Sequence, residues 1–161
     1  MKEIEHLANA EAYYLIDREN FWYASILRVV DGLTAEQAAQ VPAPGFNSIW
    51  QIVKHLYGSH EMFRMALRGE TDFEARLGKD WQPITDVSPD SWKEAVETLT
   101  FSCRKLGEEF SVLEDSVLDR SPAPDWPTLR DSLYGLIAHS GYHTAEALTI
   151  RHMLGLWLEK T

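Results

Sequence analysis

The segment TLRDSLYGLIAHSGYHTAEALTIRHMLG, residues 128–155, has the apolar spacing of one long helix packed on a hydrophobic core. If His139 is placed at 0° and each residue advances by about 100°, the large apolar side chains gather between about 20° and 120°. Gly155 then supplies a stop signal, so the segment predicts a helix from Thr128 to Leu154. The apolar stripe consists of Leu129, Leu133, Leu136, Ala147, Ile150 and Leu154.

Two further helices are predicted in the first half of the chain. No proline or glycine interrupts residues 4–30, and Asp31-Gly32 then forms a stop signal, so we expect one helix from Ile4 to Val30. Farther along, Ser48 and Gln51 have the spacing of a capping box, in which each side chain bonds the backbone of the other residue. A second helix is therefore expected from Ser48 to about Arg68.

The second half adds one more helix and completes the fold prediction. Ser88 can cap a third helix, with Pro89 at its first position. Before it, Gly69, Gly78 and Pro83 break the chain, although residues 73–77 (FEARL) suit a single turn. No segment alternates with the period of two that strands require. Four long helices in 161 residues predict an all-α fold, a four-helix bundle in one domain spanning residues 1–161.

Charge and cysteine content narrow the classes of partner and compartment. The formal net charge is −10, from 25 acidic and 15 basic residues, which disfavours nucleic acid and anionic membrane surfaces as partners. Cys103 is the only cysteine and so has no intramolecular disulfide partner. The opening MKEIEH does not resemble a secretory signal, and no apolar run reaches the roughly 18 residues of a membrane span. We therefore expect a soluble, cytoplasmic protein.

His139 and His143 are four residues apart, which places both imidazoles on one face of the predicted last helix. They lie in or beside the apolar stripe, whereas His152 points the opposite way. Buried imidazoles need partners for their ring nitrogens. One interpretation is a shared metal ion. The alternative is a pair of core histidines bonded to backbone or carboxylate groups.

A third ligand can come from the helix that begins after Ser48. There His55 and His60 flank the apolar stripe on opposite sides, and periodicity does not choose between them. His6, close to the amino terminus, is expected to be exposed.

Three other side chains are candidates for the site. Glu146 lies on the same side as His139 and His143, and it can act as a general base, as a fourth ligand, or as an acceptor that orients an imidazole. Tyr142 lies at the edge of the site, where it can donate a hydrogen bond to a ligand or simply pack at an interface. Arg18, near the apolar face of the first helix, can bind a substrate carboxylate or lay its stem along the core.

Three segments together resemble the DinB/YfiT-like family of small helical metalloenzymes. They are DRENFWYASILRVVDGLTAEQ (17–37), NSIWQIVKHLYGSHEMF (47–63) and LYGLIAHSGYHTAEALTIRHMLG (133–155). Residues 70–125 match only as an irregular link and another helix. The family's first histidine follows a Ser/Thr-Ile-Trp segment, and the other two lie in a late HxxxH motif, which here correspond to His55, His139 and His143. Where many relatives have glutamine, this chain has Glu146.

The resemblance implies a three-histidine metal site, helices in up-down-down-up order, and a homodimer. Three neutral imidazoles leave a coordination position open, as in catalytic sites, and nitrogen ligands suit a divalent metal, with zinc the first choice and nickel the next. The expected function is a metal-dependent hydrolase, or a transferase that uses a low-molecular-weight thiol, acting on a small molecule. The alternative is a dimeric bundle that binds a metal or ligand without turnover.

Overall fold

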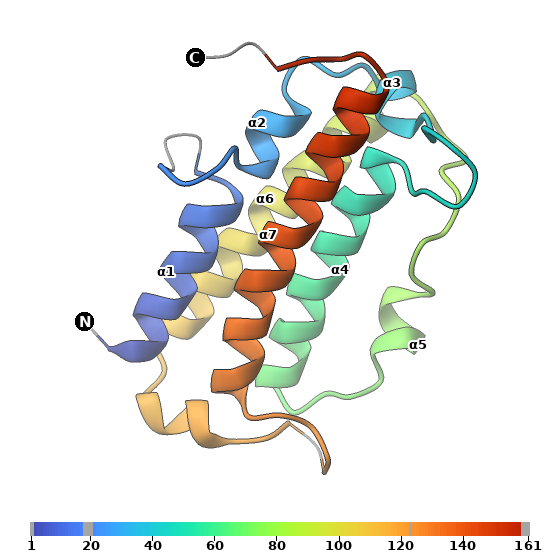
Figure 1. Ribbon diagram of the computed structural model, residues 1–161. Coiled ribbons are helices and arrows are strands. Elements are labelled where there is room, and N and C mark those ends of the chain that lie inside the picture. The colour runs from blue at the N-terminus through green and yellow to red at the C-terminus, as the bar shows by residue number, and fades with distance from the viewer. Residues whose placement is uncertain (1, 18–20, 123, 159–161) are drawn as a thin grey trace.

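The computed structural model describes residues 2–17, 21–122 and 124–158, and this part of the chain contains helices and no β-strand (Figure 1). The all-α class expected from the sequence is therefore confirmed. Four helices are long: α1 (Glu3–Leu15), α4 (Ile49–Leu67), α6 (Pro89–Ser111) and α7 (Leu129–Met153). The shorter ones are α2 (Ile26–Val30), α3 (Ala35–Ala39), α5 (Phe73–Leu77) and the 3-10 helix η1 (Asp115–Asp119).

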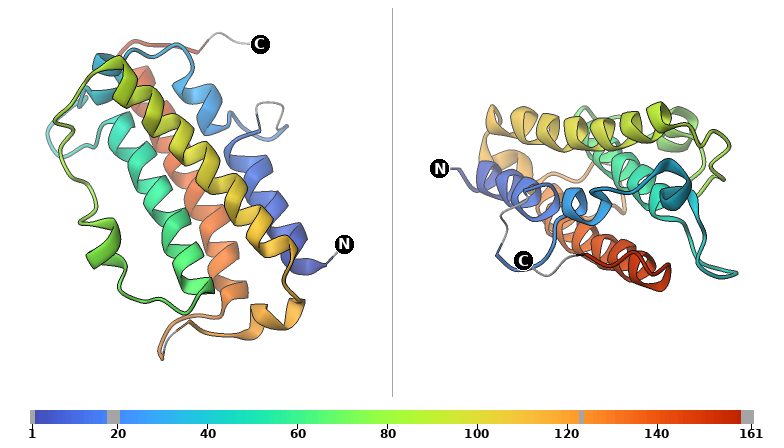
Figure 2. Two further views of the ribbon diagram at one scale, coloured as in Figure 1. Left: turned by 180° about the vertical axis from the view of Figure 1, so that it is seen from behind. Right: turned by 90° about the horizontal axis from the view of Figure 1, so that it is seen from above.

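The long helices lie side by side, and α1 and α4 each pack against both α6 and α7. Helices α1 and α7 run in one direction, and α4 and α6 run in the other (Figures 1 and 2). Helix α5 stands apart, beside α4, on the long connection between α4 and α6. Among the described helices, none has both the length and the apolar character that a membrane span requires.

Side chains cap the starts of the long helices α4, α6 and α7. The predicted capping box of α4 is present: the Gln51 backbone N–H donates to Ser48 Oγ at 3.2 Å, and the Ser48 N–H donates to Gln51 Oε1 at 2.9 Å. Ser88 caps α6, which has proline at its start, and Thr128 caps α7. The turn expected from residues 73–77 is α5. These side chains satisfy N–H groups that have no partner within their own helix.

The prediction of one continuous helix over residues 4–30 is wrong. Helix α1 ends at Leu15, and a separate helix, α2, begins after Ser25, whose side chain accepts a hydrogen bond from the Arg28 N–H. The sequence itself offers a reason, because the four consecutive polar residues 17–20 interrupt the apolar stripe that α1 buries. Helices draw most of their stability from packing such a stripe, so a helix can end where the stripe ends without proline or glycine.

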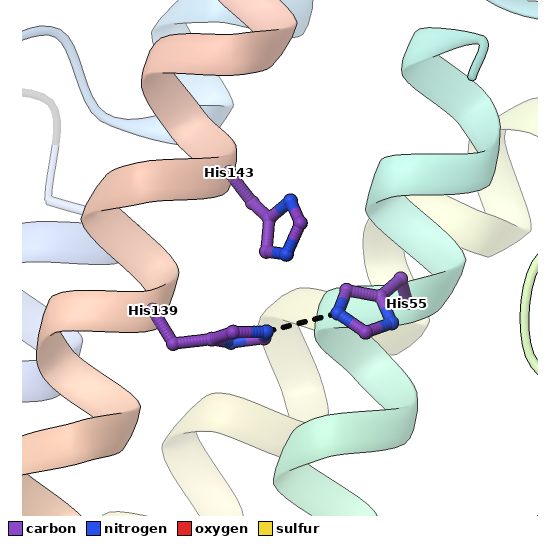
Figure 3. Close-up of side chains that lie close together, drawn as sticks. All are labelled: His55, His139 and His143. Atoms are coloured by element: carbon purple, nitrogen blue, oxygen red, sulfur yellow. Dashed lines mark hydrogen bonds between the residues drawn. The ribbon is translucent and has the colours of Figure 1, made fainter. Parts of the chain in front are cut away.

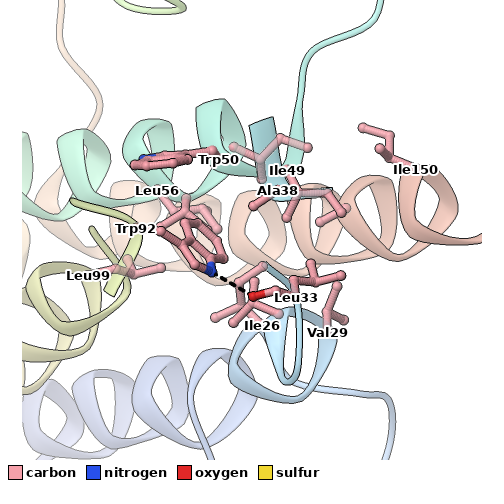
Figure 4. Close-up of a cluster of buried hydrophobic side chains, with 14 of the residues drawn as sticks. Ile26, Val29, Leu33, Ala38, Ile49, Trp50, Leu56, Trp92, Leu99 and Ile150 are labelled. Carbon is pink, nitrogen blue, oxygen red and sulfur yellow. Dashed lines mark hydrogen bonds between the residues drawn. The ribbon is translucent and has the colours of Figure 1, made fainter. Parts of the chain in front are cut away.

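Within the described residues, the core consists of two apolar clusters with a polar layer between them. One cluster gathers around Trp92, whose indole N–H donates to the Leu33 carbonyl at 3.2 Å (Figure 4). The other lies toward the start of α1 and includes Phe110 and Leu133. Where the helices pass from one cluster to the other, their buried residues are polar: Glu11 of α1, His60 of α4 and Ser140 of α7.

Candidate metal centre

The imidazoles of His55, His139 and His143 converge on one point between α4 and α7 (Figure 3). His55 Nε2 lies 2.9 Å from His139 Nε2, and the three potential ligand atoms all lie within 4.8 Å of one another. His143 is buried, and the other two are half-buried. The tilt of Cβ atoms on a helix explains the α7 pair, because residues four apart stand one above the other on the same face.

Two of the three rings are held from behind by carboxylates. His55 Nδ1 donates to Asp80 Oδ2 at 2.5 Å, and His143 Nδ1 donates to Glu146 Oε2 at 2.7 Å. An ionised carboxylate only accepts, so in a neutral ring the proton sits on Nδ1 and the lone pair is left on Nε2. This is the tautomer in which a metal-binding histidine bonds a carboxylate through its other nitrogen.

The environment also favours the uncharged form of His139 and His55. Burial, together with the neighbouring imidazoles of His143, His55 and His60, lowers the pKa of His139 to about 4. Burial also lowers the pKa of His55, although the Asp80 carboxylate opposes it. Metal ions bind only the neutral imidazole, so the protein environment prepares these nitrogens for coordination at neutral pH.

The donor set fits a divalent cation. Two Nε2 lone pairs that face each other at 2.9 Å repel unless a proton or a cation lies between them. Three imidazole nitrogens that lie within 4.8 Å of one another are ligands that a divalent cation such as zinc would accept. The three histidines can therefore hold a metal ion.

A cavity of about 880 Å³ opens beside the histidines. It lies between α4, α5 and α7, and it is bordered by the connections that contain Asp80 and Trp126. His55 and His139 form part of its wall, and most of the remaining wall is apolar or aromatic. A small molecule in this cavity would reach the point where the imidazoles meet.

The connection between α5 and α6 carries two side chains of the site that the sequence did not reveal, Asp80 and Trp81. The Trp81 ring stacks on the His55 ring, with 4.2 Å between ring centroids. Trp81 directly follows Asp80, which accepts the hydrogen bond from His55 Nδ1. Trp81 has a φ of 58°, a left-handed conformation that is rare for a bulky residue. Gln51 Nε2 anchors the loop by donating to the Trp81 and Gln82 carbonyls. In the sequence, Asp80 showed only as one acidic residue in an irregular segment.

The other predicted site residues lie in different surroundings. Glu146 binds Nδ1 of His143, which places its carboxylate behind the ring and away from the point of convergence. Tyr142 is 66% exposed and does not line the cavity, although its ring centroid is 4.8 Å from that of His143. Arg18 lies outside the described residues.

The remaining histidines are separate from the centre. His60 is fully buried in the polar layer, where Nδ1 donates to the Leu56 carbonyl at 2.7 Å and Nε2 lies 2.9 Å from Glu11 Oε1. His152 stacks on Trp157, and His6 is exposed, as expected. The choice that periodicity left open between His55 and His60 is resolved by the structure, because only His55 joins the α7 pair.

Comparison with known proteins identifies a family. The family model described as the DinB superfamily matches residues 22–147, well over half of the chain, and this range contains all three converging histidines together with Asp80 and Glu146. No curated protein matches the chain.

Proposed function

The chain belongs to the DinB superfamily, and on that basis we propose that it is a metal-dependent enzyme acting on a small molecule at His55, His139 and His143. The observation that carries the proposal is the convergence of three imidazoles, two of them backed by carboxylates, at the wall of a large cavity. A histidine network that served only to stabilise the core would not need an adjoining cavity of about 880 Å³.

We propose zinc as the metal, with nickel as the next candidate, because all-nitrogen ligation suits both ions. Three protein ligands leave a coordination position for substrate or water, which is the arrangement of catalytic rather than structural sites. A divalent cation held there supplies Lewis acidity that activates water or a thiol at neutral pH.

The two carboxylates have defined roles in this proposal. Asp80 and Glu146 hold the Nδ1 protons of His55 and His143, so that both rings stay in one tautomer and one orientation. Trp81 covers one face of His55 and restricts the rotation of its ring. Glu146 thus orients a ligand, because its position behind His143 separates it from the point where a substrate would react.

The reaction we propose is hydrolysis, or transfer to a low-molecular-weight thiol. Both reactions need a nucleophile generated near neutral pH and a substrate held next to it. The cavity supplies the second requirement, since its apolar wall can bind the substrate and exclude bulk water from the histidines.

Metal content is the first test. Protein purified without an affinity tag and dialysed against zinc should contain about one ion per chain by elemental analysis. The loaded protein is then screened with ester and amide substrates, and with low-molecular-weight thiols plus electrophilic acceptors. A wild-type protein that takes up no zinc or nickel would contradict the proposal, and a protein that holds the metal without turnover would be a binding protein.

A further inference from the structure

We propose that the substrate is an elongated, largely apolar molecule that carries an anionic metal-binding group at one end. This inference rests on the proposed function, because it places the anionic group at the three histidines. It adds the chemistry of the rest of the molecule, which the cavity wall determines.

The wall beyond the histidines is apolar and is built from separate parts of the chain. Met62 and Phe63 come from α4, and Leu136 comes from α7. Phe73 of α5 packs against Trp126, with 5.1 Å between ring centroids, so these two rings form one continuous aromatic surface. Covering such a surface with an apolar group of a ligand favours binding, because apolar area is removed from water.

The size of the cavity indicates a molecule far larger than the reacting group. About 880 Å³ lies near the upper end of the range of roughly 300 to 1,000 Å³ that holds drug-sized ligands. Water or a small thiol would leave most of the apolar wall wet. His139 and Trp126 both line the cavity, so an extended molecule that reached from one to the other would cover the apolar wall between them.

The charges around the cavity favour an anionic group at the histidine end. The whole chain has a net charge of −10, yet two lysines, Lys54 and Lys79, line this cavity. The charges of the two lysines are balanced by two carboxylates, Asp80 in the described part of the lining and Glu146 behind His143. A divalent cation on three neutral imidazoles would add two positive charges, so this end would attract an anion and repel a cation.

The test uses straight-chain alkyl hydroxamates, which combine a metal-binding anionic group with an apolar chain of adjustable length. Calorimetric titration of zinc-loaded protein should show affinity rising about two- to fourfold for each added methylene from acetohydroxamate to octanohydroxamate. In Trp126→Ala, which shortens the apolar wall, the gain with chain length should fall to less than half. Trp157→Ala, the matched exposed tryptophan outside the cavity, should behave as wild type.

A second measurement separates this inference from the proposed function. Metal-free protein is titrated with 1-anilinonaphthalene-8-sulfonate, an anionic aromatic probe whose fluorescence rises in apolar surroundings. Binding should weaken at least fivefold in Trp126→Ala and stay unchanged in Trp157→Ala. If the wild-type protein took up no metal but bound the probe as expected, only the proposed function would be contradicted. The inference about the substrate would be overturned if the affinity for hydroxamates did not change with chain length. Equal probe binding by Trp126→Ala and Trp157→Ala would overturn it as well.

Discussion

His55 Nε2 and His139 Nε2 lie 2.9 Å apart although 84 residues separate them in the chain. Helices α4 and α7 bring them together, and Asp80 holds the far nitrogen of His55 so that its Nε2 faces inward. Because Asp80 accepts the proton of His55 Nδ1, the lone pair of this ring is on Nε2, and either a proton on His139 Nε2 or a cation can occupy the space between the two nitrogens. The first two predictions test whether that space holds a metal ion.

Replacing His143 by alanine should remove the metal. One of the three ligands would be lost, and the remaining pair would hold the ion too weakly to survive dialysis. Elemental analysis should fall from about one ion per chain to near zero. His152→Ala is the matched control, because that imidazole stacks on Trp157 outside the centre. Equal metal content in both variants would show that His143 is not a ligand.

Asp80→Asn and Glu146→Gln should each retain the metal but weaken its binding about 10- to 100-fold. The new amides lack the negative charge of the carboxylates, which strengthens the imidazole as an electron-pair donor to the metal. Competition with a chromogenic chelator measures the change. Asp90→Asn, on the exposed start of α6, is the control. If Glu146→Gln lost the metal as completely as His143→Ala, Glu146 would be a ligand and the open coordination position would be in question.

Glu11→Ala should reduce the free energy of unfolding by about 3 to 5 kcal/mol, the usual result of removing one partner of a buried ion pair. Glu11 is fully buried, and its Oε1 accepts from Ser140 Oγ at 2.6 Å and lies 2.9 Å from His60 Nε2. Urea denaturation of metal-free protein measures the loss. Glu5→Ala, on α1 but outside its buried face, should cost far less. Equal losses of unfolding free energy in Glu11→Ala and Glu5→Ala would contradict the prediction, because the buried position of Glu11 would then make no difference.

The same pair should make stability depend on pH above neutrality. Burial lowers the pKa of His60, but the neighbouring Cys103 and Glu11 outweigh this effect and raise it to about 10, against 6.5 for an ordinary histidine. A raised folded-state pKa gives stabilisation that is fully present below pH 6.5 and is lost as the pH rises toward 10. Metal-free protein should therefore unfold at a lower urea concentration at pH 9 than at pH 6. His60→Gln should flatten this dependence, whereas His152→Gln should leave it intact.

We also expect a homodimer that uses the outer face of α7. Between residues 134 and 145 the exposed positions of this helix carry no charge, and they include Tyr134 and Tyr142, which are 55% and 66% exposed. Light scattering should give twice the chain mass of 18.4 kDa. Tyr142→Glu should shift the protein toward the monomer, because dimerisation would bury the new charge. Phe101→Glu, on exposed α6 surface, should not. A wild-type monomer at micromolar concentration would refute the expectation.

Local chemistry accounts for what could be predicted from the sequence. The capping box of Ser48 and Gln51 marks the start of α4, and Ser88 with Pro89 marks the start of α6, because each signal is completed within four residues. The HxxxH spacing likewise places His139 and His143 on one face of α7 for reasons of helix geometry alone. The end of α1 at Leu15 has no such local signal, because no proline or glycine stands there and the helix ends where its apolar stripe is lost.

The sequence by itself determined the helical class, three of the four long helices, and the shared face of the α7 histidines. Only the tertiary structure decided that His55 joins them while His60 pairs with Glu11, and that Asp80 stands behind His55. His55 and His60 sit on two sides of one helix, and periodicity describes both equally well. Their roles differ because α7 lies against one side and α1 supplies a buried carboxylate at the other, and such contacts between distant segments exist only once the helices have packed.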